Sequence, residues 1–284
     1  MSTSTRLLAA FVVGIQLFSA SAVLAQGDPK REISKISGDL FRFRNNFHYS
    51  VFLVTSDGII ATDPINKGAA VWLKRELARR FARPVRYLIY SHDHADHISG
   101  GEVFADTAVV VAHEKAKEAI IGKNRPTAVP QIVFSDRLTL ELGGQIVELI
   151  YVGKNHSDNS IVMRFPAEKA LFAVDFIPVR SLPYRDLGDS YVEEWIESLK
   201  RVEALEFQTL IPGHGSIGSK ADVRKFRSYM EDLWGQVVSY TGQGKSEVEI
   251  NRMVKMEKYR EWSRYKEYLP LNIQGMLRQV TRSK

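Results

Sequence analysis

The chain has 284 residues, of which 44% are hydrophobic and 25% charged, the composition of a folded globular protein and not of a disordered or fibrous one. It contains no cysteine, which excludes disulfides, thiolate metal sites, iron–sulfur clusters and a cysteine nucleophile. Any metal must therefore be bound by nitrogen and oxygen ligands, for which the 7 histidines are the first candidates. The formal net charge of +6 is mild and not clustered, so no nucleic-acid partner is expected.

The first 25 residues have the three-part pattern of a secretory signal peptide. Arg6 supplies a positive charge, an apolar stretch runs from Leu7 to Phe18, and small residues lead to Ala25, after which we expect cleavage. The apolar stretch is too short to span a bilayer. We therefore expect a periplasmic or secreted protein that keeps no membrane attachment once this segment is removed.

After this segment, strands and hairpins are predicted first and helices last. Strands are expected at 40–45, 49–55, 58–62, 85–90 and 108–112, with helices at 67–81 and 114–121. Further strands are expected at 136–141, 145–151, 160–165, 170–174 and 209–211, and further helices at 193–205, 220–240, 246–256 and 271–282. Because hairpins are too frequent for a regular βαβ repeat, the pattern favours α/β layers with sheet inside and helices outside.

A compact group of metal-ligand side chains follows the predicted strand 85–90. His92, His94, Asp96 and His97 lie within six residues, where a buried strand runs out into a loop. His92 and His94 are two residues apart, so in extended backbone their side chains point the same way. Imidazole and carboxylate groups are ligands that zinc accepts when no thiolate is present. The motif therefore predicts a metal site at the end of this strand.

Three more candidate ligands stand in similar places further along the chain. His156 and His214 lie in turn-rich loops, and Asp175 directly follows an apolar predicted strand. A lone histidine is more often structural or solvated than a ligand, and His48 and His113 are interpreted in that way. A solvated surface would not place the other five histidines after apolar strands, so we interpret them as parts of a metal centre.

Taken together, the seven candidate ligands resemble the metal-binding pattern of the metallo-β-lactamase superfamily, over about residues 36–240. The ligands are His92, His94, Asp96, His97, His156, Asp175 and His214. The resemblance implies an α/β fold, an αββα sandwich with a metal cleft along one edge of its two sheets. We expect the signal peptide at 1–25, this domain at 26–240, and a helical C-terminal extension at 241–284 packed on the same domain.

The resemblance also implies which ligands bind each of the two metals. One metal would be held by His92, His94 and His156, a second by Asp96, His97 and His214, and Asp175 would bridge the two. Two Zn²⁺ ions are expected, and Fe or Mn would also suit these ligands. A hydroxide between two such ions can attack a carbonyl carbon, and Asp96 is the candidate to orient it and to carry a proton to the leaving group.

We predict a metal-dependent hydrolase whose partner is a small-molecule ester, lactone, thioester or amide. One alternative is a class B-like β-lactamase, although the thiolate-type zinc β-lactamases carry Cys where this chain has Asp175 and Lys where it has Pro178. A second alternative is a mononuclear iron persulfide dioxygenase, which would use His92, His156 and Asp175 alone.

Five residues are candidate substrate contacts. They are Phe47, Tyr49, Arg180, Tyr184 and Arg185. The two aromatics before the first hairpin could form an apolar wall, the arginines could pair with a substrate carboxylate, and the third aromatic resembles a Tyr near the bridging Asp of lactonases. Each also has an ordinary interpretation as a hairpin aromatic or a solvated loop residue, and no oligomeric state is predicted.

Overall fold

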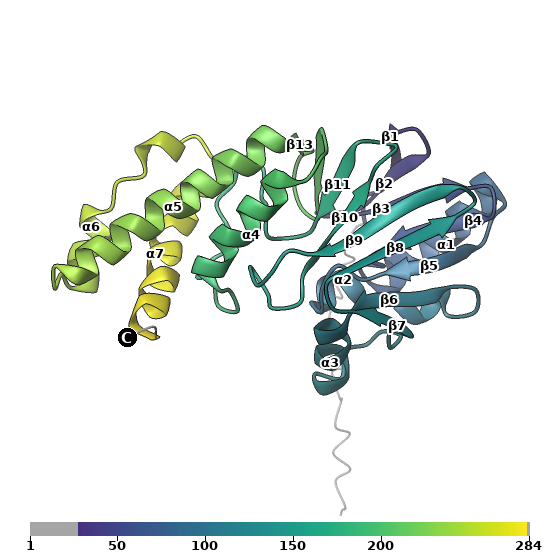
Figure 1. The fold of residues 1–284 in the computed structure, drawn as a ribbon, viewed down its shortest axis with the longest axis horizontal. Helices are drawn as coiled ribbons and strands as arrows, with labels where there is room; N and C mark the ends of the chain where they lie inside the picture. The colour runs from purple at the N-terminus through teal and green to yellow at the C-terminus, as the bar shows by residue number, and fades with distance from the viewer. Residues whose placement is uncertain (1–27, 283–284) are drawn as a thin grey trace, which may run out of the picture.

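Two β-sheets form the centre of the computed structural model, which describes residues 28–282 (Figure 1). The first sheet has seven strands in chain order: β1 (Arg31–Ser37), β2 (Leu40–Asn45), β3 (His48–Thr55), β4 (Gly58–Thr62), β5 (Val85–Ile89), β6 (Val109–His113) and β7 (Ile132–Phe134). Strands β1 to β4 are antiparallel neighbours, and β4 to β7 are parallel. The sheet is therefore mixed, with hairpins at one side and crossovers at the other.

The second sheet has six strands in the order β13-β12-β11-β10-β9-β8. They are β8 (Arg137–Leu142), β9 (Gln145–Tyr151), β10 (Ile161–Phe165), β11 (Ala170–Ala173), β12 (Thr209–Pro212) and β13 (Gly218–Ser219). All neighbours in it are antiparallel except β11 and β12, which are parallel. The crossover between those two strands contains a helix, as a parallel pair requires.

Helices cover the outer faces of both sheets. They are α1 (Lys67–Phe81), α2 (Ala95–Ile98), α3 (Glu114–Gly122), α4 (Val192–Ala204), α5 (Lys220–Gly242), α6 (Glu247–Met253) and α7 (Tyr265–Arg282), with 3₁₀ turns η1 (Gly101–Phe104) and η2 (Glu257–Tyr259). Figure 1 shows α1 on one side of the two sheets and α4 and α5 on the other. The predicted αββα sandwich with C-terminal helices is confirmed.

The burial pattern of β3 explains why these strands read as continuous apolar runs. Val51 and Leu53 pack in the core between the two sheets, whereas Phe52 packs in the core beneath α1 and α3. Successive side chains of a strand point to opposite faces, so a strand covered on both faces needs apolar residues at every position. A third core lies between the second sheet and helices α4 to α7 and contains Trp195 and Phe226.

The observed elements differ from the predicted ones mainly at edges and ends. Strand β1 was not predicted, because an edge strand that alternates exposed and half-buried positions and carries Arg31, Glu32 and Lys35 lacks a strong apolar signal. Strand β7 was not predicted either, and it has only three residues. Helix α7 begins at Tyr265, six residues before the predicted start, and runs through Pro270, a residue that usually ends or begins a helix.

The C-terminal helices share one core with the second sheet. Within it the Tyr229 hydroxyl on α5 donates a hydrogen bond of 2.6 Å to Asn272 on α7. Helix α5 crosses the predicted boundary at residue 240, so the division into a domain and an extension stays a prediction. Between residues 28 and 282, no helix combines the length and the apolar character needed to cross a membrane. The predicted signal peptide lies outside the described residues.

Candidate metal centre

The candidate ligands gather at one edge of the sandwich, where both sheets contribute loops. The segment from His92 to His97 follows β5 of the first sheet, while Asp175 and His214 follow β11 and β12 of the second. His156 lies in the loop between β9 and β10. The carboxyl ends of parallel strands meet at one sheet edge, a place where loops commonly build a site. All seven predicted ligands are brought together there.

The first group of potential ligands consists of His92, His94, His156 and Asp175, with one ligand atom of each within 4.8 Å of the others. The Nε2 atoms of His92 and His156 are buried and have no hydrogen-bond partner among the described residues. Burial lowers the pKa of His156 to about 4 and that of His92 well below its usual value, so both rings are neutral at pH 7. A neutral imidazole with a free lone pair is the form that binds a metal.

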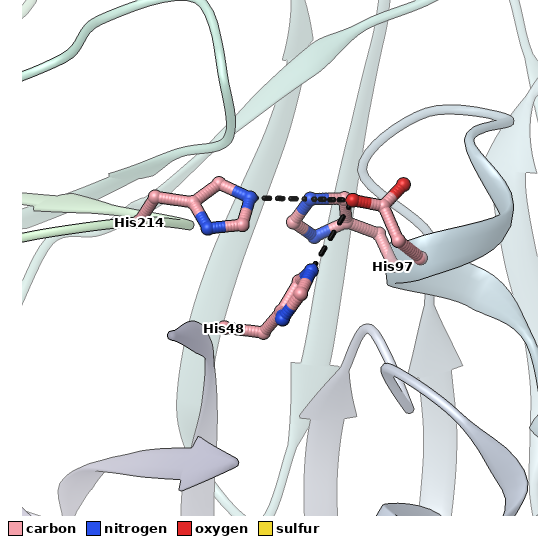
Figure 2. A group of neighbouring side chains, drawn as sticks. His48, His97 and His214 are labelled. Atoms are coloured by element: carbon pink, nitrogen blue, oxygen red, sulfur yellow. Dashed lines mark hydrogen bonds and ion pairs between the residues drawn. The ribbon is translucent and has the colours of Figure 1, made fainter. Parts of the chain in front are cut away.

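The second group consists of His48, Asp96, His97 and His214, again with one ligand atom of each within 4.8 Å of the others. Figure 2 shows the rings of the three histidines pointing toward one another. The Nδ1 of His214 lies 2.9 Å from the Phe47 carbonyl oxygen. A carbonyl only accepts, so Nδ1 carries the proton and Nε2 is left free to act as a ligand.

The sequence predicts a structural or solvated role for His48, whereas the structure places its ring among the potential ligands. The signal for it is weak, since a single histidine after a turn has no partner nearby in sequence. His113 keeps the structural role assigned to it. Its Nε2 donates to the Ser135 carbonyl at 2.9 Å, and its Nδ1 accepts from the Lys115 amide at 3.2 Å.

Asp175 lies between the two groups. Its Oδ2 is 3.6 Å from His92 Nε2 and 3.0 Å from His97 Nε2, and its Oδ1 is 3.2 Å from His214 Nε2. Burial by itself would raise the pKa of Asp175, but the neighbouring histidines, His97 first, hold it well below its usual range. One ionised carboxylate thus touches potential ligands of both groups, the position required of a bridging ligand.

The donor set fits metal binding. An unpaired buried polar atom costs roughly 1–3 kcal/mol, and the free Nε2 atoms of His92 and His156 face the same carboxylate of Asp175. A bound cation would satisfy these lone pairs together, with nitrogen and oxygen ligands that suit Zn²⁺, Fe or Mn.

A buried carboxylate that the sequence analysis did not single out lies behind the second group. Asp63 is fully buried, and its Oδ1 accepts a hydrogen bond of 2.8 Å from the Ser91 amide. Its Oδ2 lies 3.9 Å from His97 Nδ1, on the side of the ring away from Asp175. Burial raises the pKa of Asp63 to about 6. Its position after an apolar strand, like that of Asp175, was the signal that could have found it.

A second buried carboxylate braces the loop that carries His92 and His94. Asp93 accepts hydrogen bonds from Lys123 at 2.8 Å, Arg125 at 3.0 Å and Asn159 at 3.0 Å. Burial opposes its ionisation, yet these donors outweigh it and lower the pKa of Asp93 to about 2. The network ties this loop to the segment after α3 and to the loop of His156, so two ligand-bearing loops are held in register.

The predicted substrate contacts fall in two places. Phe47 and Tyr49 lie beside the loop of His214, and the other three lie beside the segment that leads into α7. Phe47 is 78% exposed next to His214, whereas Tyr49 packs under the Arg42 guanidinium, 3.5 Å from its ring centroid. Tyr184 packs edge-on against Tyr268 of α7. Arg185 lies over the Tyr184 ring, and the Arg180 carbonyl accepts a hydrogen bond from the Ser263 amide. Within residues 28–282 no hydrogen bond or ion pair joins these last residues to the histidine cluster, and their role in substrate binding stays a prediction.

This fold and this His/Asp centre define a class of metal-dependent enzymes, and comparison with known families identifies it. Residues 38–214 match the model of the metallo-beta-lactamase superfamily. The chain therefore belongs to the metallo-β-lactamase superfamily and is an enzyme of that superfamily, a hydrolase with two candidate metal sites.

The sequence identity between this chain and individual relatives is low. The chain is 28% identical over 192 residues to the 2,4-dinitroanisole O-demethylase subunit alpha of a Nocardioides strain, a match that covers 66% of this chain and 58% of that protein. It is 27% identical over 220 residues to a metallo-beta-lactamase type 2 of Elizabethkingia meningoseptica, covering 72% and 86% of the two chains. The solved metallo-beta-lactamase from Pontibacter korlensis shares the fold, with a TM-score of 0.63, 22% identity, and 71% and 99% of the two chains covered.

Proposed function

We propose that this protein is an exported dinuclear zinc hydrolase that cleaves an ester, lactone, thioester or amide carbonyl of a small molecule. The observation that carries the proposal is the position of Asp175, whose carboxylate lies between two groups of potential ligands. Bridging by one carboxylate suits two ions a few ångströms apart better than one ion alone.

The proposal assigns the seven predicted ligands to two ions. His92, His94 and His156 would hold one ion, Asp96, His97 and His214 the second, and Asp175 both. Two bound ions would lower the pKa of a water between them and polarise the substrate carbonyl.

Asp96 is the residue that would handle the proton. Its side chain is 55% exposed, so it can reach both the centre and an incoming substrate. Burial would raise the pKa of Asp96, but the hydrogen bond to His48 and the charge of His97 outweigh it and lower the pKa to about 2. The carboxylate is thus ionised at pH 7 and able to accept the proton of the attacking water and to pass it to the leaving group as the carbonyl–heteroatom bond breaks.

β-Lactam hydrolysis is the second candidate, favoured by the names of relatives such as the metallo-beta-lactamase type 2 of Elizabethkingia meningoseptica. The strained amide of a β-lactam belongs to the same class of carbonyl substrates. Against it stand Asp175 and Pro178, where the thiolate-type β-lactamases carry Cys and Lys. The demethylase relative suggests a third substrate to include in any assay, an activated aryl methyl ether.

A substrate panel tests the proposal. Zinc-loaded protein would be assayed with a carbapenem, nitrocefin, an acyl-homoserine lactone, a glutathione thioester, 2,4-dinitroanisole and a persulfide with oxygen uptake recorded. We expect turnover of a carbonyl ester, lactone, thioester or amide that disappears on chelation and returns with Zn²⁺. One bound iron per chain with oxygen consumption would instead support the persulfide dioxygenase, and no dependence on any metal would overturn the proposal.

Export forms a separate part of the proposal. The first strand begins at Arg31, so cleavage after Ala25 would remove no described element. Mass spectrometry of the protein recovered from the periplasm or medium of its host should give a chain that begins at residue 26. Recovery of a full-length chain from the cytosol would contradict export.

A further inference from the structure

His48 is a histidine outside the predicted ligand set whose ring nevertheless faces the second group. It is the first residue of β3, on the hairpin with β2, and lies 48 residues before Asp96. Its Nε2 is 3.2 Å from Asp96 Oδ2, and its ring centroid is 4.6 Å from that of His214 and 5.5 Å from that of His97 (Figure 2). Its side chain is 28% exposed.

The backbone fixes this placement. An isolated antiparallel bridge joins His48 to His214, and the Tyr49 amide donates a hydrogen bond of 2.8 Å to the Gly213 carbonyl. The Phe47 carbonyl in turn accepts a hydrogen bond of 2.9 Å from His214 Nδ1. Directly opposed residues of an antiparallel pair carry their side chains side by side. The start of β3 is thus tied to the loop of His214, and the two rings are aimed at one point.

The chemistry at that point is that of a metal site. One ligand atom each of His48, Asp96, His97 and His214 lies within 4.8 Å of the others, as in the first group. Three imidazoles and a carboxylate are a complete set for a four-coordinate ion. Apart from the shared Asp175, the first group offers three ligands and the second offers four, of which His48 is the additional one.

We propose that His48 is a direct ligand of the second metal ion. The inference rests on the proposed two-metal centre and extends it, because it gives the second ion three imidazoles and Asp96 in addition to shared Asp175. Counting Asp175 for both ions, the first ion would have four protein ligands and the second five, so the loss of His48 would weaken binding of the second ion only.

The competing explanation is that His48 only orients Asp96 through a hydrogen bond. The two explanations predict different behaviour of a glutamine variant. The amide of Gln can donate to Asp96, but it is a poor substitute for an imidazole as a zinc ligand. His48→Gln therefore restores an orienting role but not a ligand.

Metal titration of the purified, metal-free protein tests the inference, with Zn²⁺ added in competition with a chromophoric chelator. For the wild-type chain we expect two bound equivalents of Zn²⁺. In His48→Ala and in His48→Gln the second equivalent should weaken at least about tenfold while the first is unchanged. His113→Asn is the matched control, since it removes a histidine outside the centre and Asn can cap α3.

A spectroscopic readout accompanies the titration. In the Co²⁺-substituted protein each bound histidine gives a paramagnetically shifted imidazole N–H resonance, and His48→Gln should show one fewer than wild type once the second equivalent is bound. Unchanged second-site affinity in both variants would overturn the inference, as would loss in His48→Ala with full recovery in His48→Gln. Fewer than two equivalents in the wild type would overturn the two-metal function itself, so the two failures are distinguishable.

Discussion

Two residues show how tightly the centre is built. Asp175 has a φ of 66°, a left-handed conformation that a non-glycine residue rarely adopts and that aims its carboxylate between the ligand groups. Gly213 precedes His214 at a position where a Cβ would lie 2.6 Å from the Val174 side chain and 3.1 Å from the His97 ring. A side chain there would displace a ligand, so the loop of His214 requires glycine.

Asp96→Asn is the sharpest test of the proton-transfer role. The substitution keeps the shape of the side chain and removes its charge, so the side chain can no longer accept a proton. Because Asp96 is also a proposed ligand of the second ion, two bound Zn²⁺ per variant chain are confirmed before the assay. We expect kcat/KM of the zinc-loaded protein to fall by about 100-fold or more with the thermal midpoint little changed. Asp57→Asn, at an exposed hairpin turn, is the control. Wild-type kcat/KM in Asp96→Asn would contradict the role.

Glu168 predicts a pH-dependent loss of stability away from the centre. Its side chain is buried, its Oε2 has no hydrogen-bond partner among the described residues, and burial raises its pKa. The folded protein therefore binds this proton more tightly than the unfolded chain does. Stability from this group is present below the unfolded pKa and is lost as pH rises through the folded pKa.

Glu168→Gln removes that loss. At pH 7 we expect its free energy of unfolding to exceed that of wild type by about 1 kcal/mol, the lower end of the range for an unpaired buried polar group. The gain should vanish at pH values below the unfolded pKa of the carboxyl, measured by urea denaturation across pH. Glu141→Gln, exposed on β8, is the control. A gain independent of pH would show that ionisation is not its cause.

At the scale of the element, strand ends and helix interiors behave differently. The loops of Asp175 and His214 follow β11 and β12, whose side chains are almost all buried, so these loops start from well-packed strand ends. The bridge between His48 and His214 adds a connection between the two sheets at the centre itself. Helix α5, in contrast, contains an exposed glycine at a position where neither the backbone conformation nor the neighbouring atoms require glycine.

Gly235 lies inside α5, and a Cβ added there meets no atom within 4 Å. Gly235→Ala should raise the free energy of unfolding by roughly 0.5–1 kcal/mol, because Ala restricts the unfolded chain and favours helix. Gly244 is equally open but has a φ of +73°, so Gly244→Ala should destabilise by about 1 kcal/mol. Equal effects of the two substitutions, measured by denaturation, would contradict the argument.

At the scale of the whole molecule, the centre joins the edges of two sheets whose facing sides form a shared apolar core. Metal should therefore stabilise the fold, because ions bind the assembled ligands and not the unfolded chain. At a free Zn²⁺ concentration of about 100 times Kd, the expected gain is about 2.7 kcal/mol. Calorimetry should show the thermal midpoint rising with Zn²⁺ and falling with EDTA. A midpoint insensitive to both would argue against the metal centre.

Elements with strong periodicity and the closely spaced motif can be predicted from the sequence alone. Helix α1 and strand β9 have the predicted bounds, and His92, His94, Asp96 and His97 were found because six residues contain all four. Local patterns carry such information, since side-chain direction and turn chemistry depend on near neighbours.

The distant residues that join that motif are fixed by tertiary contacts, which the sequence does not reveal. His48 meets Asp96 across 48 residues, the Phe47 carbonyl fixes the His214 tautomer across 167 residues, and Asp63 lies buried behind His97. None of these contacts has a sequence spacing that signals it, because each arises where the ends of separate strands meet. The motif thus identified the family, while the packing of the strand ends determines which side chains gather at the second candidate metal site.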